Sequence, residues 1–387
     1  MLQWMFVLTT IRVAVHARVL YVPEPVGDTS HHEFKWAMPP DSSSDTFLSH
    51  INATTRQGDI FWLVTGDAQY WVRCTPMNYD CHKHADWCDT SNSTCQRKHG
   101  DFANRVQKTS MTALIRRMRD VGNTPRGIIM NGDLTEFGHQ HELDEYDNYW
   151  PGVVERVRIY PGLGNHDYAN NVNRCALNHC ANRMLQYFYD YVRKHLRLPM
   201  HVMTKMDGIF TTVYTGSLAY SWDDCTDNGT TSNCVHFVQL NNYPTYVTRL
   251  DFFFGTNQWN IQSAIGWLRA DLNQTKHPVV INFHDFDTGF SFSDKMQLQQ
   301  VLQDSGRRVL GIFFAHYHSS IGLHPSGHWC LQGRSGRPTP LFYSGSIPGN
   351  NYLLVHYGSG TMKSVYALHS SPDNQTTVWA VNFFDRC

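Results

Sequence analysis

The sequence predicts a layered α/β fold whose C-terminal part is built of β-hairpins. Over most of the 387 residues, short apolar runs alternate with segments whose apolar residues recur at helical spacing, as in sheets covered by helices. Beyond residue 340, Tyr- and Val-rich runs separated by Gly, Pro and Asn indicate hairpins. No Pro- or Ser-rich linker divides the chain, so we expect a single domain over residues 18–387.

The first half of the chain is predicted to contain three strands and a long helix. The apolar runs at 61–65, 127–130 and 157–160 are short enough to be buried strands. Between the first two runs, residues 102–120 carry Val, Met, Leu and Ile on one helical face.

The second half repeats this alternation before it changes to hairpins. Residues 258–272 and 294–304 have the amphipathic spacing of helices, and each segment precedes an apolar run, at 278–283 and 309–314. The expected hairpin strands follow at 340–346, 351–358, 363–369 and 377–384.

Composition and charge exclude several classes of protein. Hydrophobic residues make up 41% and charged residues 17% of the chain, as in a globular protein rather than a disordered one. The 32 Lys and Arg residues nearly balance the 33 Asp and Glu residues, so no nucleic-acid surface is expected. No later segment approaches about 18 consecutive apolar residues, so we expect no transmembrane segment in the mature chain.

The N-terminus, the cysteines and the sequons favour export. Residues 1–17 hold an apolar stretch and end in Val-His-Ala, a small-residue site suited to signal-peptide cleavage, although Arg12 interrupts the run. Ten cysteines are many for a reducing compartment, and buried free thiols in a cytosolic enzyme are the alternative. Glycosylation sequons begin at Asn52, Asn92, Asn228, Asn273 and Asn374. We therefore expect a secreted, disulfide-bonded glycoprotein.

The cysteines are unevenly distributed. Four of them lie seven residues apart in an insert at 72–100, namely Cys74, Cys81, Cys88 and Cys95. Two further local pairs are Cys175 with Cys180 and Cys225 with Cys234. None belongs to a C-x-x-C motif, so a zinc ribbon is disfavoured; the even number fits disulfides whose pairing stays open.

A potential metal ligand follows every predicted strand that precedes the hairpins. In chain order, the series is Asp67 and Gln69, Asp133, Asn165, His284, and His316 with His318. Such side chains can meet because sites in open α/β sheets form at the carboxyl edge. Carboxylate and amide oxygens mixed with imidazoles suit a pair of divalent ions such as Mn, Fe, Zn or Mg. Two such ions about 3.5–4 Å apart can activate water and stabilise an in-line phosphoryl displacement.

These ordered motifs resemble those of the calcineurin-like metallophosphoesterase superfamily. The resemblance covers roughly residues 58–322 and rests on Asp67-x-Gln69, Gly132-Asp133, Gly164-Asn165-His166-Asp167, His284 and His316-x-His318. It implies a layered β-sandwich flanked by helices. It also implies an enzyme that hydrolyses a phosphomonoester, phosphodiester or pyrophosphate bond of a small-molecule substrate, through a hydroxide that bridges two metal ions.

The resemblance implies a role for each residue of the site. One metal would be held by Asp67, Gln69, Asp133 and His318. Asp133 would bridge to the second metal, which Asn165, His284 and His316 would complete. His166 would stabilise charge or protonate the leaving group beside the scissile phosphate, and Asp167 would orient His166.

Two residues depart from the family pattern. Gln69 stands where the first motif normally has His, and an amide oxygen is a harder and weaker ligand than imidazole, which favours Mn or Mg. Ala315 replaces the usual Gly before His316 and is expected to be tolerated if the backbone there is ordinary.

Two other hypotheses stay open. Gln69 favours a secreted binding protein that retains the fold with little or no turnover. A structural metal protein is the third hypothesis, but such a protein would not need the pair His166 and Asp167.

Other polar and aromatic residues near the motifs are interpreted as structural. His82-x-His84 and His139-x-His141 follow no predicted strand, and 22 histidines produce such pairs by chance. Asp59 precedes its strand instead of following it. The aromatic residues beside the motifs are Tyr70, Trp71, Tyr168 and Phe286. They could stack on a nucleobase or a choline-like group, but loop packing is the simpler explanation.

Overall fold

The computed structural model describes residues 44–70, 93–173, 175, 178–207, 211–226, 234–250, 257–330, 338–370 and 376–381. All of them belong to the compact unit Trp36–Cys387. The expected signal peptide (1–17), most of the Cys-rich insert (72–100) and His82-x-His84 lie outside the described residues. Within the described ranges, no helix has the length and apolar character needed to cross a membrane.

The first large sheet has the strand order β17-β16-β15-β1-β2-β4-β3. The predicted strands β1 (Ile60–Thr65), β2 (Gly127–Met130) and β4 (Val157–Pro161) lie in its centre and run parallel. The predicted hairpin strands β15 (Asn351–Gly358), β16 (Thr361–Ser370) and β17 (Thr376–Val381) extend the sheet antiparallel on the β1 side. The short β3 (Val153–Val154) pairs with β4 at the other edge.

The second large sheet has the order β13-β14-β12-β11-β8-β7. Its four inner strands run parallel, and they are β8 (Cys234–Gln239), β11 (Val279–Asn282), β12 (Val309–Phe314) and β14 (Pro338–Ser344). The edge strands β7 (Tyr220–Cys225) and β13 (Ile321–Cys330) are antiparallel to their neighbours. The predictions of β11, β12 and β14 are thereby confirmed to within two residues at each end.

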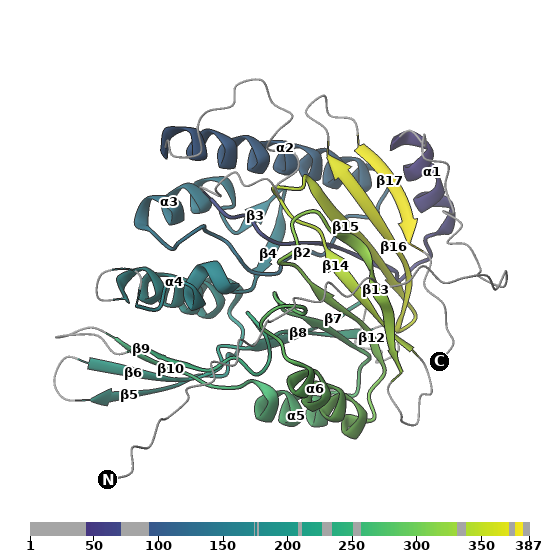
Figure 1. Cartoon of the computed structure of the whole chain (residues 1–387). Coiled ribbons are helices and arrows are strands. Elements are labelled where there is room, and N and C mark those ends of the chain that lie inside the picture. The colour runs from purple at the N-terminus through teal and green to yellow at the C-terminus, as the bar shows by residue number, and fades with distance from the viewer. Residues whose placement is uncertain are drawn as a thin grey trace, which may run out of the picture. The chain divides into compact units, whose positions relative to one another are not determined.

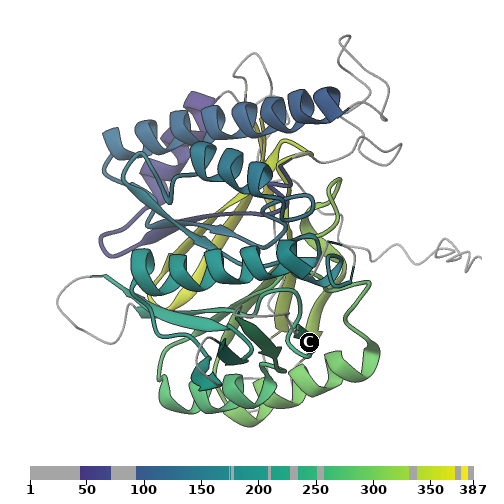
Figure 2. The same cartoon turned by 90° about the vertical axis from the view of Figure 1, so that its left-hand side faces the viewer.

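The two large sheets pack face to face, and helices cover their outer faces (Figures 1 and 2). Side chains alternate between the two faces of β1, so both faces of the sheet are covered. Trp62 and Val64 join the core between the sheets, whereas Phe61 and Leu63 face the helices. The first sheet is covered by α1 (Ser44–Thr54), α2 (Ser93–Asp120) and α3 (Gln140–Tyr149). The second sheet is covered by α5 (Ile265–Gln274) and α6 (Phe292–Ser305). The predicted layered sandwich flanked by helices is confirmed.

Further helical segments join the two layers. Leu185 and Phe188 of α4 (His179–Asp190) enter the core between the sheets. Two π-helical segments, η2 (Asn165–Ala169) and η4 (Tyr191–Leu196), lie on either side of α4 in the sequence.

A third, smaller sheet was not predicted, and it corrects one expected helix. Its strand order is β5-β6-β10-β9, with β5 (Met203–Asp207), β6 (Thr211–Gly216), β9 (Thr248–Leu250) and β10 (Gln258–Ile261). The helix expected over 258–272 therefore begins only at Ile265, because Trp259 and Ile261 point inward as alternate residues of a strand. The expected helix over 102–120 is longer than predicted and begins at Ser93.

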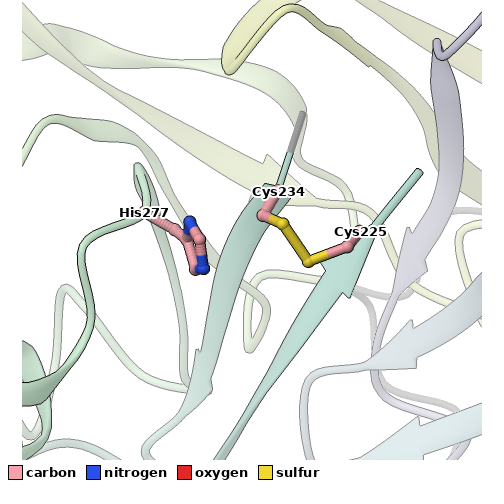
Figure 3. A group of neighbouring side chains, drawn as sticks. All are labelled: Cys225, Cys234 and His277. Atoms are coloured by element: carbon pink, nitrogen blue, oxygen red, sulfur yellow. A yellow bond between two sulfur atoms is a disulfide. The ribbon is translucent and has the colours of Figure 1, made fainter. Parts of the chain in front are cut away.

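Two local cysteine pairs form disulfides. Cys175 is bonded to Cys180, and Cys225 at the end of β7 is bonded to Cys234 at the start of β8. His277 lies beside the second disulfide (Figure 3). Because the two sulfur atoms are bonded to each other, this group of three residues is a strand crosslink and not a metal site.

A histidine held between two carboxylates ties α5 to the edge of the second sheet. His236 Nδ1 lies 2.7 Å from Asp223 Oδ1, and its Nε2 lies 2.8 Å from Asp271 Oδ2. Burial disfavours the charged ring, but both carboxylates outweigh burial and raise the pKa of His236 to about 9. At neutral pH, His236 is therefore a buried cation with two anionic partners.

Replacement of His236 by Gln is expected to lower the free energy of unfolding by about 2 kcal/mol at neutral pH, because both carboxylates lose their cation. The pKa in the folded state lies above the usual value of about 6.5. The stabilisation is thus complete below about pH 6.5 and is lost as the pH rises through about 9. Urea unfolding of wild type and His236→Gln across this range measures the difference. The exposed His179 supplies the control variant His179→Gln, and a difference that does not change with pH would contradict the assignment.

Candidate metal centre

The predicted ligands lie in loops at the carboxyl ends of strands from both large sheets. Asp67 and Gln69 follow β1, Asp133 follows β2, Asn165 follows β4, His284 follows β11, and His316 and His318 follow β12. The sheets are tied together at this edge by Asn131 in the loop after β2. Its Nδ2 donates to the carbonyl oxygen of Phe313 (3.3 Å) and to Ser344 Oγ (2.8 Å). The sandwich thereby gathers residues that are far apart in the sequence.

Four side chains converge in the first part of the site. His284 Nε2 lies 2.9 Å from Asn165 Oδ1 and 3.0 Å from Asp133 Oδ2. His316 Nδ1 lies 3.0 Å from Asn165 Oδ1 and 3.2 Å from His284 Nε2. Ligand atoms around one ion are roughly 3 Å apart when each metal–ligand bond is about 2.1 Å long. These spacings fit a ligand set around one divalent cation.

The hydrogen bonds around His284 indicate that these four side chains need a positive charge between them. His284 Nδ1 lies 2.8 Å from the carbonyl oxygen of Asn131 and donates its proton there, which leaves a lone pair on Nε2. That lone pair faces two oxygen acceptors, those of Asn165 and Asp133. Burial disfavours a charged His284, yet the charge of Asp133 outweighs burial and raises the pKa of His284 to about 10. The site attracts a proton where a metal cation would fit.

A second set of polar atoms lies beside the first. Asp67 Oδ1 and Gln69 Oε1 are buried, and neither has a hydrogen-bond partner among the residues that the structure describes. His318 Nε2 lies 3.5 Å from Asp67 Oδ1. Native proteins rarely leave buried oxygens unpaired, so these two atoms also fit the coordination of a cation.

Asp133 stands between the two sets. Its Oδ1 accepts the backbone N–H of His166 at 2.8 Å, which fixes the carboxylate. Its Oδ2 lies 3.0 Å from His284 Nε2 and 3.4 Å from Gln69 Nε2, within reach of both sets. Burial alone would raise the pKa of Asp133, but the charges of His284 and His166 hold it well below its usual range. Asp133 Oδ2 therefore contacts one residue of each set.

Several of these residues have an unusual backbone conformation. The angle φ is positive at Asp67 (52°), Gln69 (33°), Asp133 (51°) and His316 (72°), where residues other than glycine are rare. Such a residue costs about 1–3 kcal/mol and persists only where its surroundings fix it. The backbone N–H of Gln69 donates to the carbonyl oxygen of Asp133 at 2.8 Å, one of the bonds that fix these loops. Four of the thirteen non-glycine residues with positive φ in the described part of the chain are predicted ligands, and strained backbone of this kind is common at functional sites.

His166 lies next to this site with its ring held from one side. Its Nδ1 donates to the carbonyl oxygen of Glu136 at 2.8 Å, and Glu136 Oε2 lies 3.6 Å from the same nitrogen. Nε2 is therefore the ring nitrogen that these two contacts leave available. Burial lowers the pKa of His166, but the charges of Asp133 and Glu136 outweigh burial and raise it. A protonated imidazole in this position can stabilise charge and donate a proton.

Asp167 has other partners than the ring of His166. Its carboxylate accepts the backbone N–H groups of Leu134 (2.9 Å), Thr135 (3.1 Å) and Gly164 (2.8 Å). These bonds join the loop that carries Asp133 to the loop that carries His166. The expectation that Asp167 orients the ring is corrected accordingly: Asp167 fastens the two loops, and Glu136 contacts the ring.

Two partners of the site were missed in the sequence. The carbonyl oxygen of Asn131 fixes His284, and a backbone carbonyl leaves no signal in residue identity. Glu136 could have been found as an acidic residue three positions after Asp133. Its Oε2 is buried without a hydrogen-bond partner among the described residues, and burial raises the pKa of Glu136 to about 7.

The structural interpretation of His139-x-His141 is supported. His139, His141 and Glu142 are close enough to hold a metal. However, the Glu142 carboxylate already accepts the backbone N–H groups of Phe137 and His139, both at 2.9 Å, and closes the first turn of α3. Asp59 is likewise engaged elsewhere, with His356 Nε2 at 2.8 Å.

The packing interpretation of the aromatic residues is confirmed for those that the structure describes. Tyr70, Tyr168 and Phe286 are buried. Trp71 lies outside the described residues.

The sequence matches no protein-family model, and a search of curated proteins returns no match. Among solved structures, the chain is similar to the 5′-nucleotidase from Candida albicans, with 12% identity and a TM-score of 0.43, over 85% of this chain and 52% of that one. It is also similar to the sulfate thiohydrolase SoxB from Thermus thermophilus, with 14% identity and a TM-score of 0.40, over 82% and 57% of the two chains. The chain thus spans about half the length of each of these proteins. Because both TM-scores are below 0.5, the function is inferred from the residues of this chain.

Ala315 is accommodated by a glycine on the neighbouring strand end. A Cβ atom on Gly66 would lie 2.4 Å from Ala315 Cβ, closer than two carbon atoms can approach. Ala315 itself is not among the residues with positive φ, so its departure from the usual glycine causes no backbone strain.

The variant Gly66→Ala is expected to lower the free energy of unfolding by about 2–3 kcal/mol through this overlap. Adding Ala315→Gly should recover part of the loss, because the overlapping atom is removed. Gly266→Ala in α5 is the matched control, since nothing lies within 4 Å of its Cβ position. Thermal unfolding of the three variants tests the contact, and a double variant no more stable than Gly66→Ala would argue against it.

Proposed function

We propose that this chain is a di-metal hydrolase of phosphate esters. The observation that carries the proposal is that Asp133 Oδ2 contacts a residue of each set, with His284 Nε2 at 3.0 Å and the donating Gln69 Nε2 at 3.4 Å. One ion would be held by Asn165, His284 and His316, the other by Asp67, Gln69 and His318, with Asp133 common to both. A structural metal site would not need two adjacent sets and a histidine poised at their edge.

A bound divalent pair lowers the pKa of a water molecule and polarises phosphoryl oxygens. The protein residues supply the rest. Asp67, Asp133 and His284 are buried, and the hydrogen bond from the backbone N–H of Gln69 to the carbonyl oxygen of Asp133 helps to fix the loops that carry them. Asp167 keeps the loop of Asp133 and the loop of His166 in register through its three backbone contacts.

His166 would act as the proton donor to the leaving group. Its backbone N–H is fixed by Asp133 and its Nδ1 by Glu136, so the ring has one orientation in which Nε2 is available. In the metal-free site, the charges of Asp133 and Glu136 raise the pKa of His166. A leaving alkoxide gains most from such a proton, because its conjugate acid is weak.

The proposed location is the secretory lumen or the extracellular space. Two disulfides among the described residues support it. The sequon asparagines Asn52 and Asn273 are exposed, as glycosylation requires.

Removal of metal is expected to abolish hydrolysis. Treatment with EDTA and the variant Asp133→Ala should each eliminate cleavage of bis-p-nitrophenyl phosphate, with loss of both metals in Asp133→Ala as measured by elemental analysis. A chelated enzyme that hydrolyses this substrate at the full rate would refute the proposal.

The variant His166→Ala is expected to keep its metals and to lose turnover by about 10²–10⁴-fold on esters with an alkyl leaving group. The loss should be smaller with p-nitrophenolate, which leaves without a proton. The exposed His179 provides the control His179→Ala. Equal losses on both kinds of leaving group would exclude His166 as a proton donor.

The variant Gln69→His distinguishes an active enzyme that uses Gln69 as a metal ligand from a binding protein with little or no turnover. We expect tighter zinc binding, because imidazole is the softer ligand, without a gain in turnover. Turnover that appears only in Gln69→His would instead favour the secreted binding protein. Calorimetric titration with Zn²⁺ and Mn²⁺, beside activity, distinguishes the two outcomes.

A further inference from the structure

A polar chain leads from the metal centre into the turn that follows β11. Thr288 Oγ1 lies 2.8 Å from His316 Nε2 on one side and 2.7 Å from Asp285 Oδ2 on the other. His316 comes from the loop after β12, so the chain joins two separate loops of the second sheet. Neither Asp285 nor Thr288 belongs to the predicted ligand set.

The surroundings of Asp285 fix the direction of these hydrogen bonds. Its Oδ1 accepts the backbone N–H groups of Asp287 (3.1 Å) and Thr288 (2.8 Å), and its Oδ2 accepts that of Gly289 (2.6 Å). Within the described residues, every hydrogen-bond partner of the Asp285 carboxylate is a donor, so the carboxylate accepts in each of these bonds. The single hydroxyl proton of Thr288 therefore points to Asp285.

The direction of the hydrogen bond from Thr288 to Asp285 determines the tautomer of His316. Since the Thr288 proton is used at Asp285, the hydroxyl oxygen must accept from His316, and the ring proton lies on Nε2. The lone pair of the neutral ring is then on Nδ1. That nitrogen faces Asn165 Oδ1 at 3.0 Å and His284 Nε2 at 3.2 Å, inside the proposed metal site.

His284 and His316, the two histidines of the first ligand set, are fixed by different hydrogen bonds. His284 presents Nε2 because its Nδ1 donates to the carbonyl oxygen of Asn131. His316 presents Nδ1 because its Nε2 faces a hydroxyl. The rings stand nearly perpendicular, at 84° with centroids 5.1 Å apart, so their nitrogen atoms approach the site from different directions. A residue that fixes the tautomer of a ligand in this way raises its affinity for metal.

We propose that Thr288, anchored by Asp285, is a positioning residue that holds His316 with Nδ1 toward the metal. The inference rests on the proposed di-metal function and adds to it the residue that sets one ligand. It assigns a role to the local sequence Asp285-x-x-Thr288-Gly289, in which one carboxylate folds the turn and aligns the hydroxyl.

The test compares Thr288→Val, which keeps the shape but removes the hydroxyl, with Thr288→Ser, which keeps the hydroxyl. Calorimetric titration of the full chain with Mn²⁺ should show affinity about 10–100-fold weaker in Thr288→Val and close to wild type in Thr288→Ser. Thr212→Val in β6 is the matched control for the same chemical change in the third sheet. An affinity of Thr288→Val within twofold of wild type would overturn the proposal.

A second measurement does not depend on whether Thr288→Val folds. The ¹⁵N chemical shifts of the His316 ring in the wild-type protein should show the proton on Nε2, and a proton on Nδ1 in the Mg²⁺-loaded protein would overturn the proposal. The failure of this inference is distinct from that of the proposed function. A wild type that binds Mn²⁺ and hydrolyses esters while His316 has the other tautomer contradicts only the role of Thr288, whereas a wild type that binds no metal contradicts both.

Discussion

The mutual repulsion of hydrogen-bond acceptors at one edge of the sandwich is the constraint on which the rest of the site depends. His284 Nε2 lies 2.9 Å from Asn165 Oδ1 and 3.0 Å from Asp133 Oδ2, so an unprotonated Nε2 directs its lone pair at two acceptor oxygens. Such a group is stable only around a positive charge, and it must be held in place by other bonds. The backbone hydrogen bonds accepted by the buried carboxylate of Asp167 are among those that hold it.

The location of the site follows from how the two sheets are joined. Parallel strands direct their carboxyl ends to one edge, and the sandwich brings the edges of both sheets together. Asn131 links them, since its side chain donates to Phe313 and Ser344 of the second sheet while its carbonyl oxygen accepts from His284. The same contacts of Asn131 therefore join the two sheets and align the ligands. A change in sheet register would separate Asp133 from His284 and disrupt both sets.

The strands and the residues that follow them could be predicted from sequence because each signal is local. A short apolar run ending in a polar residue identifies β1 with Asp67 and β12 with His316 without any long-range information. The third sheet could not be predicted, because β10 pairs with β6 and β9 and its few residues fit a helix equally well. Contacts such as that of Thr288 with His316 depend on how two loops meet, and residue type alone does not encode this.

The hydrogen-bond partners of Asp167 could not be predicted from sequence either, although Asp167 belongs to a predicted motif. Position beside His166 favoured a contact between the two side chains, but the buried carboxylate turns to backbone N–H groups that the fold leaves unpaired. Backbone groups are invisible in a sequence, although they supply several of the bonds that shape this site.

The most direct test of the central claim is anomalous diffraction from crystals of the wild-type chain soaked in Mn²⁺. The account predicts two peaks about 3.5–4 Å apart, with Asp133 Oδ2 between them and His284 and His318 on opposite sides. A single peak, or peaks located only at His139 and His141, would contradict it.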